Sequence, residues 1–132
     1  MTTVVAVANP RTGSGKTTTV AALGAEWASM GNAVLAIDLD PQAALTRRLG
    51  IDAEEVEQSI FDVIMYGEPV VRAMVDTAAN IDLVPAALEL SGVEAALVTR
   101  SGREQLVRDA LRDVREDYDW VLVDCSSSLG IL

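Results

Sequence analysis

The sequence predicts an α/β fold, a doubly wound and mainly parallel β-sheet flanked by helices. Two observations predict it: apolar segments of strand length recur along the chain, and segments with helical spacing of apolar residues separate them. Each apolar segment is nearly continuous, as expected for strands that helices cover on both faces. The four segments are Val4–Ala8, Ala33–Ile37, Ile81–Val84 and Trp120–Val123. Helices between parallel strands then form right-handed crossovers.

The helices are predicted from apolar spacing and from start and stop signals. Thr17–Met30 carries apolar residues at helical spacing, and the glycine that follows is a typical stop. Ala43–Ala79 is expected to form short helices interrupted by glycines. Two S-x-x-E capping boxes, which begin at Ser91 and Ser101, predict further helices, and the second helix runs to about Glu116.

Composition indicates a single soluble domain over residues 1–132. Twenty acidic against ten basic residues give a formal net charge of −10. Such a surface repels nucleic acid on average, so DNA contact needs a local basic patch. No apolar run reaches the ~20 residues that span a bilayer, and no basic-then-apolar leader is present. We therefore expect a cytoplasmic protein that does not enter the membrane.

The most informative segment surrounds Lys16, the single lysine of the chain. It connects the first predicted strand to the first predicted helix and reads Pro10-Arg11-Thr12-Gly13-Ser14-Gly15-Lys16-Thr17-Thr18. Gly13 and Gly15 allow successive backbone N–H groups to point toward an anion, and the helix N-terminus adds positive potential. Lys16 is expected to reach the β- and γ-phosphates, and the Thr17 hydroxyl to bind Mg²⁺. The segment predicts a nucleotide site, although Pro10 replaces the first glycine of the strict G-x-x-x-x-G-K-[ST] pattern. The alternative is a glycine turn that merely precedes a helix.

Two further predicted strands end in carboxylates, at the edge where open parallel sheets bind ligands. Asp38-Leu39-Asp40-Pro41-Gln42 follows one strand, and Asp124 follows the other. Mg²⁺ prefers one or two carboxylates together with water and phosphate oxygens. We expect Asp124 to bind the metal, Asp38 to steady a metal-bound water and Asp40 to orient the attacking water. The alternative for each aspartate is a cap or a turn at a strand end.

Together these motifs resemble the ParA/MinD group of deviant Walker A ATPases, and within it the ParA-type partition ATPases. The group's K-G-G-x-G-K-T-T loop corresponds to Arg11–Thr18, its D-x-D-P-Q motif to Asp38–Gln42, and its D-C-P-P-S-L-G motif to Asp124–Gly130. The resemblance covers essentially the whole chain. It implies the fold of phosphate-loop NTPases, here truncated after the Walker B strand, and it implies ATP and Mg²⁺ as cofactors.

The resemblance also implies roles for individual residues. Those implied in catalysis are Lys16, Asp40 and Arg11. Those implied in metal binding are Thr17, Asp38 and Asp124. Those implied in nucleotide binding form one continuous loop: Arg11, Thr12, Gly13, Ser14, Gly15, Lys16, Thr17 and Thr18. Arg11 replaces the signature lysine of the group, and two roles are open for it: contact with the phosphates of a dimer partner, or a solvated loop position.

The function that the resemblance implies is a slow ATPase that acts as a dimerisation switch in plasmid or chromosome partition or in cargo positioning. The implied partners are a second copy of the chain, in an ATP-dependent homodimer, and a centromere-binding ParB-like protein or cargo adaptor. Members of the group extend beyond the third motif, so we expect this chain to be an N-terminal fragment or a truncated member. Nonspecific DNA binding and nucleoid association are expected only through the missing C-terminal half.

Other functions remain open. A truncated, weakly or non-hydrolysing interaction or regulatory module would keep the same fold, and the substitutions in the loop favour it. A MinD-like membrane-cycling ATPase needs a C-terminal amphipathic helix, and an iron–sulphur relative needs more cysteine than Cys125. Acidic residues alternate with the arginines of the last predicted helix, which favours a solvated, internally paired face over DNA contact. These arginines are Arg108, Arg112 and Arg115.

Overall fold

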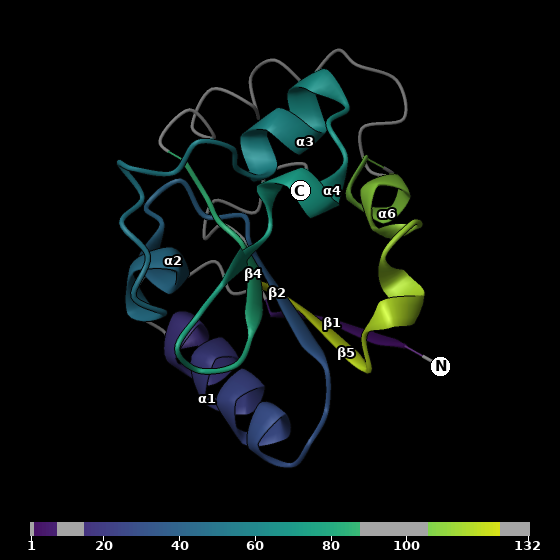
Figure 1. Ribbon diagram of the computed structural model, residues 1–132. Coiled ribbons are helices and arrows are strands. Elements are labelled where there is room, and N and C mark those ends of the chain that lie inside the picture. Colours follow the sequence, from purple (N-terminus) through teal and green to yellow (C-terminus); the bar gives the residue numbers. More distant parts are fainter. Residues whose placement is uncertain (1, 8–14, 88–105, 125–132) are drawn as a thin grey trace.

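The structure is a computed structural model that describes residues 2–7, 15–87 and 106–124 (Figure 1). Five strands form one sheet: β1 Thr3–Val7, β2 Val34–Asp38, β3 Val75–Asp76, β4 Asp82–Val84 and β5 Trp120–Asp124. Their order across the sheet is β1-β5-β2-β4-β3, and every neighbouring pair is parallel except β3 with β4. The predicted α/β fold with a mainly parallel sheet is confirmed.

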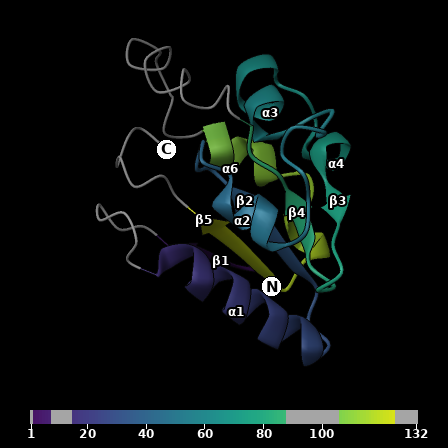
Figure 2. The same ribbon diagram turned by 90° about the vertical axis from the view of Figure 1, so that its left-hand side faces the viewer.

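Helices connect the strands and cover both faces of the sheet. They are α1 Lys16–Ser29, α2 Ala44–Arg48, α3 Ile60–Tyr66, α4 Val70–Ala73, α6 Leu106–Leu111 and the 3₁₀ helix η3 Arg115–Asp117. α1 lies on one side of the sheet, whereas α3 and α6 lie on the other (Figure 2). Within the part of the chain that the structure describes, no helix is long and apolar enough to cross a membrane.

The core is divided between the two faces of the sheet because successive residues of a strand point to opposite sides. On β2, Leu35 and Ile37 pack with residues of α3, α4 and α6. Val34 and Ala36 of the same strand pack with residues of α1 and α2. Every residue of β2 is buried, and so is all of β5 except Trp120. Cover on both faces explains the continuous apolar runs of these central strands.

α1 begins and ends close to the residues that the sequence predicts. Gly15 precedes it with a φ of 84°, and Gly31 follows it with a φ of 91°. Both values lie in the left-handed region, which favours glycine. A third glycine, Gly24, faces the sheet, where a Cβ atom would lie 2.9 Å from Cδ1 of Ile81. Glycine at this position therefore lets the helix approach the sheet closely.

Residues 43–79 contain short helices interrupted by glycines, as predicted. Gly50 follows α2 with a φ of 87°, and Gly67 ends α3 with a φ of 68°. α3 begins with a capping box, in which the Ser59 hydroxyl accepts from the helix backbone and the Asp62 carboxylate accepts from the backbone N of Ser59. Short helices form few internal hydrogen bonds, so many of their terminal backbone groups lack a partner within the helix. The caps supply hydrogen-bond partners for these groups.

Two strands differ from the expectation. β1 is not covered on both faces, since none of its side chains is buried and Val4 is 40% exposed. In the described part of the chain it is also an edge strand that pairs only with β5. β3 is absent from the prediction, because a two-residue antiparallel strand is too short to leave a periodic apolar pattern.

The last predicted helix ends earlier than expected. α6 ends at Leu111, and turns lead from it into η3, so that no single helix reaches Glu116. In these turns the backbone N of Val114 donates to the carbonyl of Leu111 at 3.2 Å, and the spacing of three residues keeps both side chains buried. Acidic residues near a helix C-terminus oppose the helix dipole, which disfavours an α-helix through Glu116 and Asp117. The capping boxes predicted at Ser91 and Ser101 lie outside the described residues.

Candidate functional site

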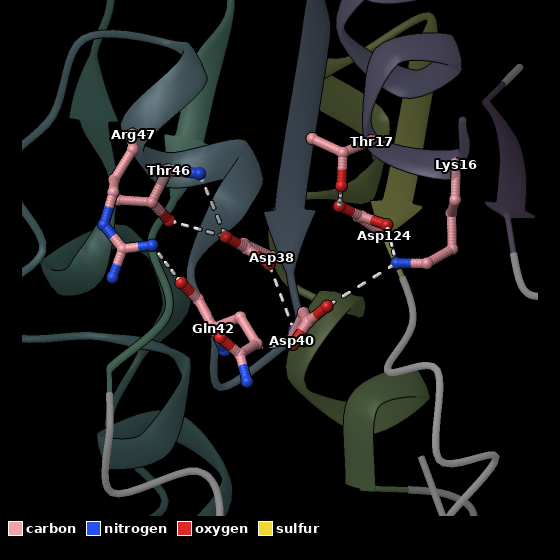
Figure 3. A network of polar contacts seen from close by, with 8 residues as sticks. All are labelled: Lys16, Thr17, Asp38, Asp40, Gln42, Thr46, Arg47 and Asp124. Carbon is pink, nitrogen blue, oxygen red and sulfur yellow. Dashed lines mark hydrogen bonds and ion pairs between the residues drawn. The ribbon is translucent and has the colours of Figure 1, made fainter. Parts of the chain in front are cut away.

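Three strands end side by side at one edge of the sheet. Val7 of β1, Asp124 of β5 and Asp38 of β2 are register partners, so they form one row across the sheet. Asp38 and Asp124 both have 0% exposure. α1 begins at the same edge and places Lys16 next to Asp124 (Figure 3). The predicted meeting of the lysine with carboxylates from two strand ends is therefore present.

Lys16 and Thr17, the first two residues of α1, both contact Asp124 (Figure 3). The Lys16 Nζ atom donates to Oδ1 of Asp124 at 2.5 Å, and the Thr17 hydroxyl donates to Oδ2 at 2.9 Å. Lys16 Nζ also lies 3.8 Å from Oδ2 of Asp40. The Lys16 side chain is 7% exposed. It is thus a buried cation that lies between two carboxylates.

Asp38 accepts hydrogen bonds from three protein groups. Its Oδ1 accepts from the backbone N of Asp40 at 3.1 Å, and its Oδ2 accepts from the backbone N and the hydroxyl of Thr46 at 3.0 and 2.8 Å. The Thr46 hydroxyl accepts in turn from the backbone N of Ala86 at 3.1 Å. Burial raises the pKa of Asp38 to about 6, although these hydrogen bonds lower it. Asp38 and Thr46 together join the end of β2 to α2 and to the segment after β4.

Asp40 lies in a turn between β2 and α2. Its Oδ1 accepts from the backbone N of Gln42 at 2.9 Å, and Arg47 donates to the carbonyl of Gln42 (Figure 3). Ala43, the last residue before α2, is fully buried and has a φ of 57°, which is strained for a residue with a side chain. The Asp40 side chain is 13% exposed. Among the three carboxylates of the site, Asp40 is therefore the one that reaches solvent.

The structure brings together five predicted site residues, namely Lys16, Thr17, Asp38, Asp40 and Asp124. Thr18 is exposed, and its hydroxyl accepts from Arg48 at 3.4 Å, a bond that connects α1 to α2. Gly15 forms the left-handed start of α1. The other predicted loop residues lie outside the described part of the chain: Arg11, Thr12, Gly13 and Ser14.

Sequence reasoning did not identify Thr46. The residue is fully buried and bonds to Asp38 and to the backbone of Ala86, so it contributes directly to the form of the site. Its only signal in the sequence is a hydroxyl in a short helical segment, next to the apolar Leu45. Hydroxyl side chains are common in such segments, and nothing local distinguishes this one.

The oxygen atoms of Thr17 and Asp124 fit a hard divalent cation such as Mg²⁺. Among the described residues, no group of three or more His, Cys, Asp and Glu side chains is placed to hold a metal. Mg²⁺ needs no such group, because it keeps several waters and uses one or two carboxylates with phosphate oxygens. The position of Lys16 at the N-terminus of α1 suits a phosphate group, because the ammonium and the helix dipole both attract an anion.

Comparison with known proteins gives consistent matches over nearly the whole chain. A family model described as AAA domain matches residues 2–132. The sporulation initiation inhibitor protein Soj of Bacillus subtilis is 39% identical over 130 residues, which are 98% of this chain and 51% of Soj. The chromosome partitioning protein ParA of Caulobacter vibrioides is 42% identical over 132 residues, which cover 98% of this chain and 49% of that protein. The chain spans about half the length of these curated relatives.

Solved structures share the fold. A cobyrinic acid a,c-diamide synthase from Mycobacterium smegmatis, with bound ATP analog and magnesium, matches with a TM-score of 0.96 and 42% identity. The match covers 99% of this chain and 54% of that one. McdA of Cyanothece, in a complex with ATP, matches with a TM-score of 0.89 and 26% identity, over 98% of this chain and 50% of that one. By its family match, its relatives and the motifs at its strand ends, the chain belongs to the AAA domain family of ParA/MinD type, the deviant Walker A ATPases.

Proposed function

We propose that this chain binds ATP with Mg²⁺ at the carboxyl edge of its sheet and hydrolyses the ATP slowly, as the switch of a ParA-type partition or positioning system. The observation that carries the proposal is the contact of Lys16 and Thr17, at the start of α1, with Asp124 at the end of β5. A cation for phosphate and two oxygen ligands for a metal thus lie together. The solved relatives with bound ATP, ATP analog and magnesium support this choice of ligand.

The start of α1 is proposed to bind the phosphates. The backbone at Gly15 and the ammonium of Lys16 contact phosphate oxygens, and residues 11–14 with Thr18 complete the loop. Thr17 and Asp124 hold Mg²⁺, which when bound offsets negative charge on the phosphates. Arg11 is proposed to contact the phosphates of a second copy of the chain, as an arginine finger does.

The turn after β2 is proposed to act on the water. Asp40 is partly exposed and lies 3.8 Å from Lys16, so its carboxylate can orient a water near the phosphate that Lys16 binds. Asp38 remains a predicted metal-site residue. Its three hydrogen bonds from Asp40 and Thr46 also suit it to support the turn that carries Asp40.

The proposed partners follow from the relatives rather than from contacts of this chain. Soj and ParA are named for sporulation and chromosome partitioning, which supports a role in partition. An ATP-dependent homodimer and a ParB-like or cargo-adaptor partner in the cytoplasm are proposed from the family resemblance of the motifs. The cobyrinic acid a,c-diamide synthase is named for a different reaction, and nucleotide binding is the property that we transfer from it. We propose no DNA contact through Arg108, Arg112 and Arg115. Arg112 pairs with Asp109 at 3.0 Å, and the whole chain carries a formal charge of −10.

The second candidate is an interaction module of the same fold that binds nucleotide without turnover. The observation that favours it is the engagement of Lys16 by two carboxylates, which compete with phosphate for the ammonium. Turnover separates the two candidates, since a switch of the first kind hydrolyses ATP and the module does not.

Equilibrium binding of a fluorescent ATP analogue in the presence of Mg²⁺ tests the nucleotide site. Lys16→Ala is expected to abolish binding, and Arg72→Ala, which removes an exposed cation of α4, serves as the matched control and should bind as the parent does. Asp40→Ala is expected to keep binding and to slow hydrolysis ~10²-fold or more. Equal affinity of the parent and Lys16→Ala would contradict the assignment of the site.

A further inference from the structure

The charges of the site form a closed group around one cation. Lys16 Nζ lies 2.5 Å from Oδ1 of Asp124 and 3.8 Å from Oδ2 of Asp40. In the described ranges, no other cation lies within ion-pair distance of Asp38, Asp40 or Asp124. With all three carboxylates ionised, the single ammonium leaves this group with an excess of negative charge. A nucleoside triphosphate without a bound cation is strongly anionic and is repelled by such a group.

We propose that Lys16 and Asp124 hold each other in a closed pair, and that binding of a divalent cation to Asp124 frees Lys16 for phosphate. The inference concerns the regulation of the nucleotide site and rests on the function proposed above. Lys16 and Thr17 are the side chains that phosphate and metal would need, and both donate to the same carboxylate. A divalent cation on Asp124 competes with the Lys16 ammonium for this carboxylate and repels the ammonium.

Burial strengthens the Lys16–Asp124 pair, so that Asp124 competes effectively with phosphate for the Lys16 ammonium. The side chains of Lys16 and Asp124 are 7% and 0% exposed, so solvent and salt screen their attraction weakly. Removal of one partner from a buried pair is strongly unfavourable, because the other charge is left without compensation. If phosphate binds Lys16 while no divalent cation is present, the buried carboxylate of Asp124 is left without a positive partner. Asp124 keeps a positive partner only if a cation arrives with the phosphate.

The closed pair couples two binding events. Because a cation on Asp124 makes Lys16 available, it strengthens nucleotide binding, and by linkage nucleotide strengthens cation binding by the same factor. Asp40 adds to the effect, since it holds a second negative charge near the same ammonium. The site therefore selects the cation–nucleotide complex over the free nucleotide.

The sequence offers a direct probe, since Lys16 is the only lysine. An amine-reactive acetylating reagent modifies Lys16 and the α-amino group of the chain, and mass spectrometry quantifies both, so that the α-amino group serves as the internal reference. Lys16 should react ~10-fold or more slowly in the folded chain with EDTA than in urea, because the pair buries and engages its amine. Addition of Mg²⁺ alone should accelerate the labelling of Lys16 several-fold, and further addition of a non-hydrolysable ATP analogue should slow it again.

Asp124→Asn removes the charge at nearly the same volume and should label Lys16 ~10-fold faster than the parent in EDTA, with no further response to Mg²⁺. Asp113→Asn makes the same chemical change at an exposed position and should label as the parent does. Labelling of Lys16 that is unchanged or slower with Mg²⁺ overturns the proposal. That arm uses the unmodified chain, so it decides the matter even if Asp124→Asn fails to fold. The Mg²⁺-only measurement contains no nucleotide. Its result is therefore independent of whether the chain binds nucleotide, and a failure of nucleotide binding would contradict the proposed function alone.

Discussion

Thr46 provides the sharpest test of how the site is supported. Its hydroxyl donates to the buried carboxylate of Asp38 at 2.8 Å and accepts from the backbone N of Ala86 at 3.1 Å. Thr46→Val keeps the shape of the side chain and removes both bonds. Loss of a donor to a charged group costs about 1.5–3 kcal/mol, and an unsatisfied buried N–H costs about 1–3 kcal/mol. We therefore expect Thr46→Val to lower the free energy of unfolding by ~3–5 kcal/mol.

Thr46→Ser is the matched control, because it keeps the hydroxyl and removes one buried methyl group. That loss costs ~1 kcal/mol. Urea unfolding at pH 7, followed by circular dichroism, measures both variants, and equal slopes against urea allow the midpoints to be compared. The ranking should be parent, then Ser, then Val. If Thr46→Val is as stable as Thr46→Ser, the hydroxyl does not hold the site together and the reasoning fails.

Three further predictions concern pH and packing. The pKa of Asp38 is about 6 in the fold against 3.8 ordinarily, so its contribution to stability is complete below pH 3.8 and is lost as pH rises through 6. Urea titrations should show the parent losing ~2.5 kcal/mol relative to Asp38→Asn between pH 4 and 7, and a constant difference would refute this. Burial and the hydrogen bond to Asp82 raise the pKa of Tyr118, so thermal melts should show stability lost above pH 10 in the parent but not in Tyr118→Phe. Identical alkaline stability profiles of the two proteins would contradict this prediction. Gly24→Ala should change the free energy of unfolding by less than ~1 kcal/mol, because the gain in helix propensity offsets the contact with Ile81. Gly24→Leu should cost ~1–3 kcal/mol by overpacking, and a tolerated leucine would show that α1 is not closely packed against the sheet there.

The parts of the fold that could be predicted are those with a local signal. The buried central strands leave continuous apolar runs, which is why β2 and β5 were predicted nearly to the residue. The helix α1 has glycine at both ends, so its limits follow from backbone geometry. The loop with Lys16 and the acids after two strands predicted the meeting of Lys16 with Asp124, because the carboxyl ends of parallel strands share one edge.

The parts that could not be predicted depend on tertiary contacts. The position of β5 between β1 and β2 is set by packing of the whole sheet and leaves no local trace in the sequence. The same holds for the bonds of Asp38, whose partner Thr46 lies in another element. The early end of α6 leaves no trace in the apolar spacing, because Leu111 and Val114 are buried three residues apart in the turns as they would be in a continued helix.

An NMR titration of the ¹⁵N-labelled chain with a non-hydrolysable ATP analogue and Mg²⁺ locates the bound ligand and so tests whether these strand ends form the nucleotide site. We predict saturable shifts that are largest for the backbone amides at the start of α1, in the turn after β2 and at the end of β5, with Lys16, Asp40 and Asp124 among them. The amides of α3 and α4, on the far face of the sheet, should change little. Absence of saturable shifts in the folded chain, or shifts centred on α3 and α4, would contradict the claim that these strand ends form a nucleotide site.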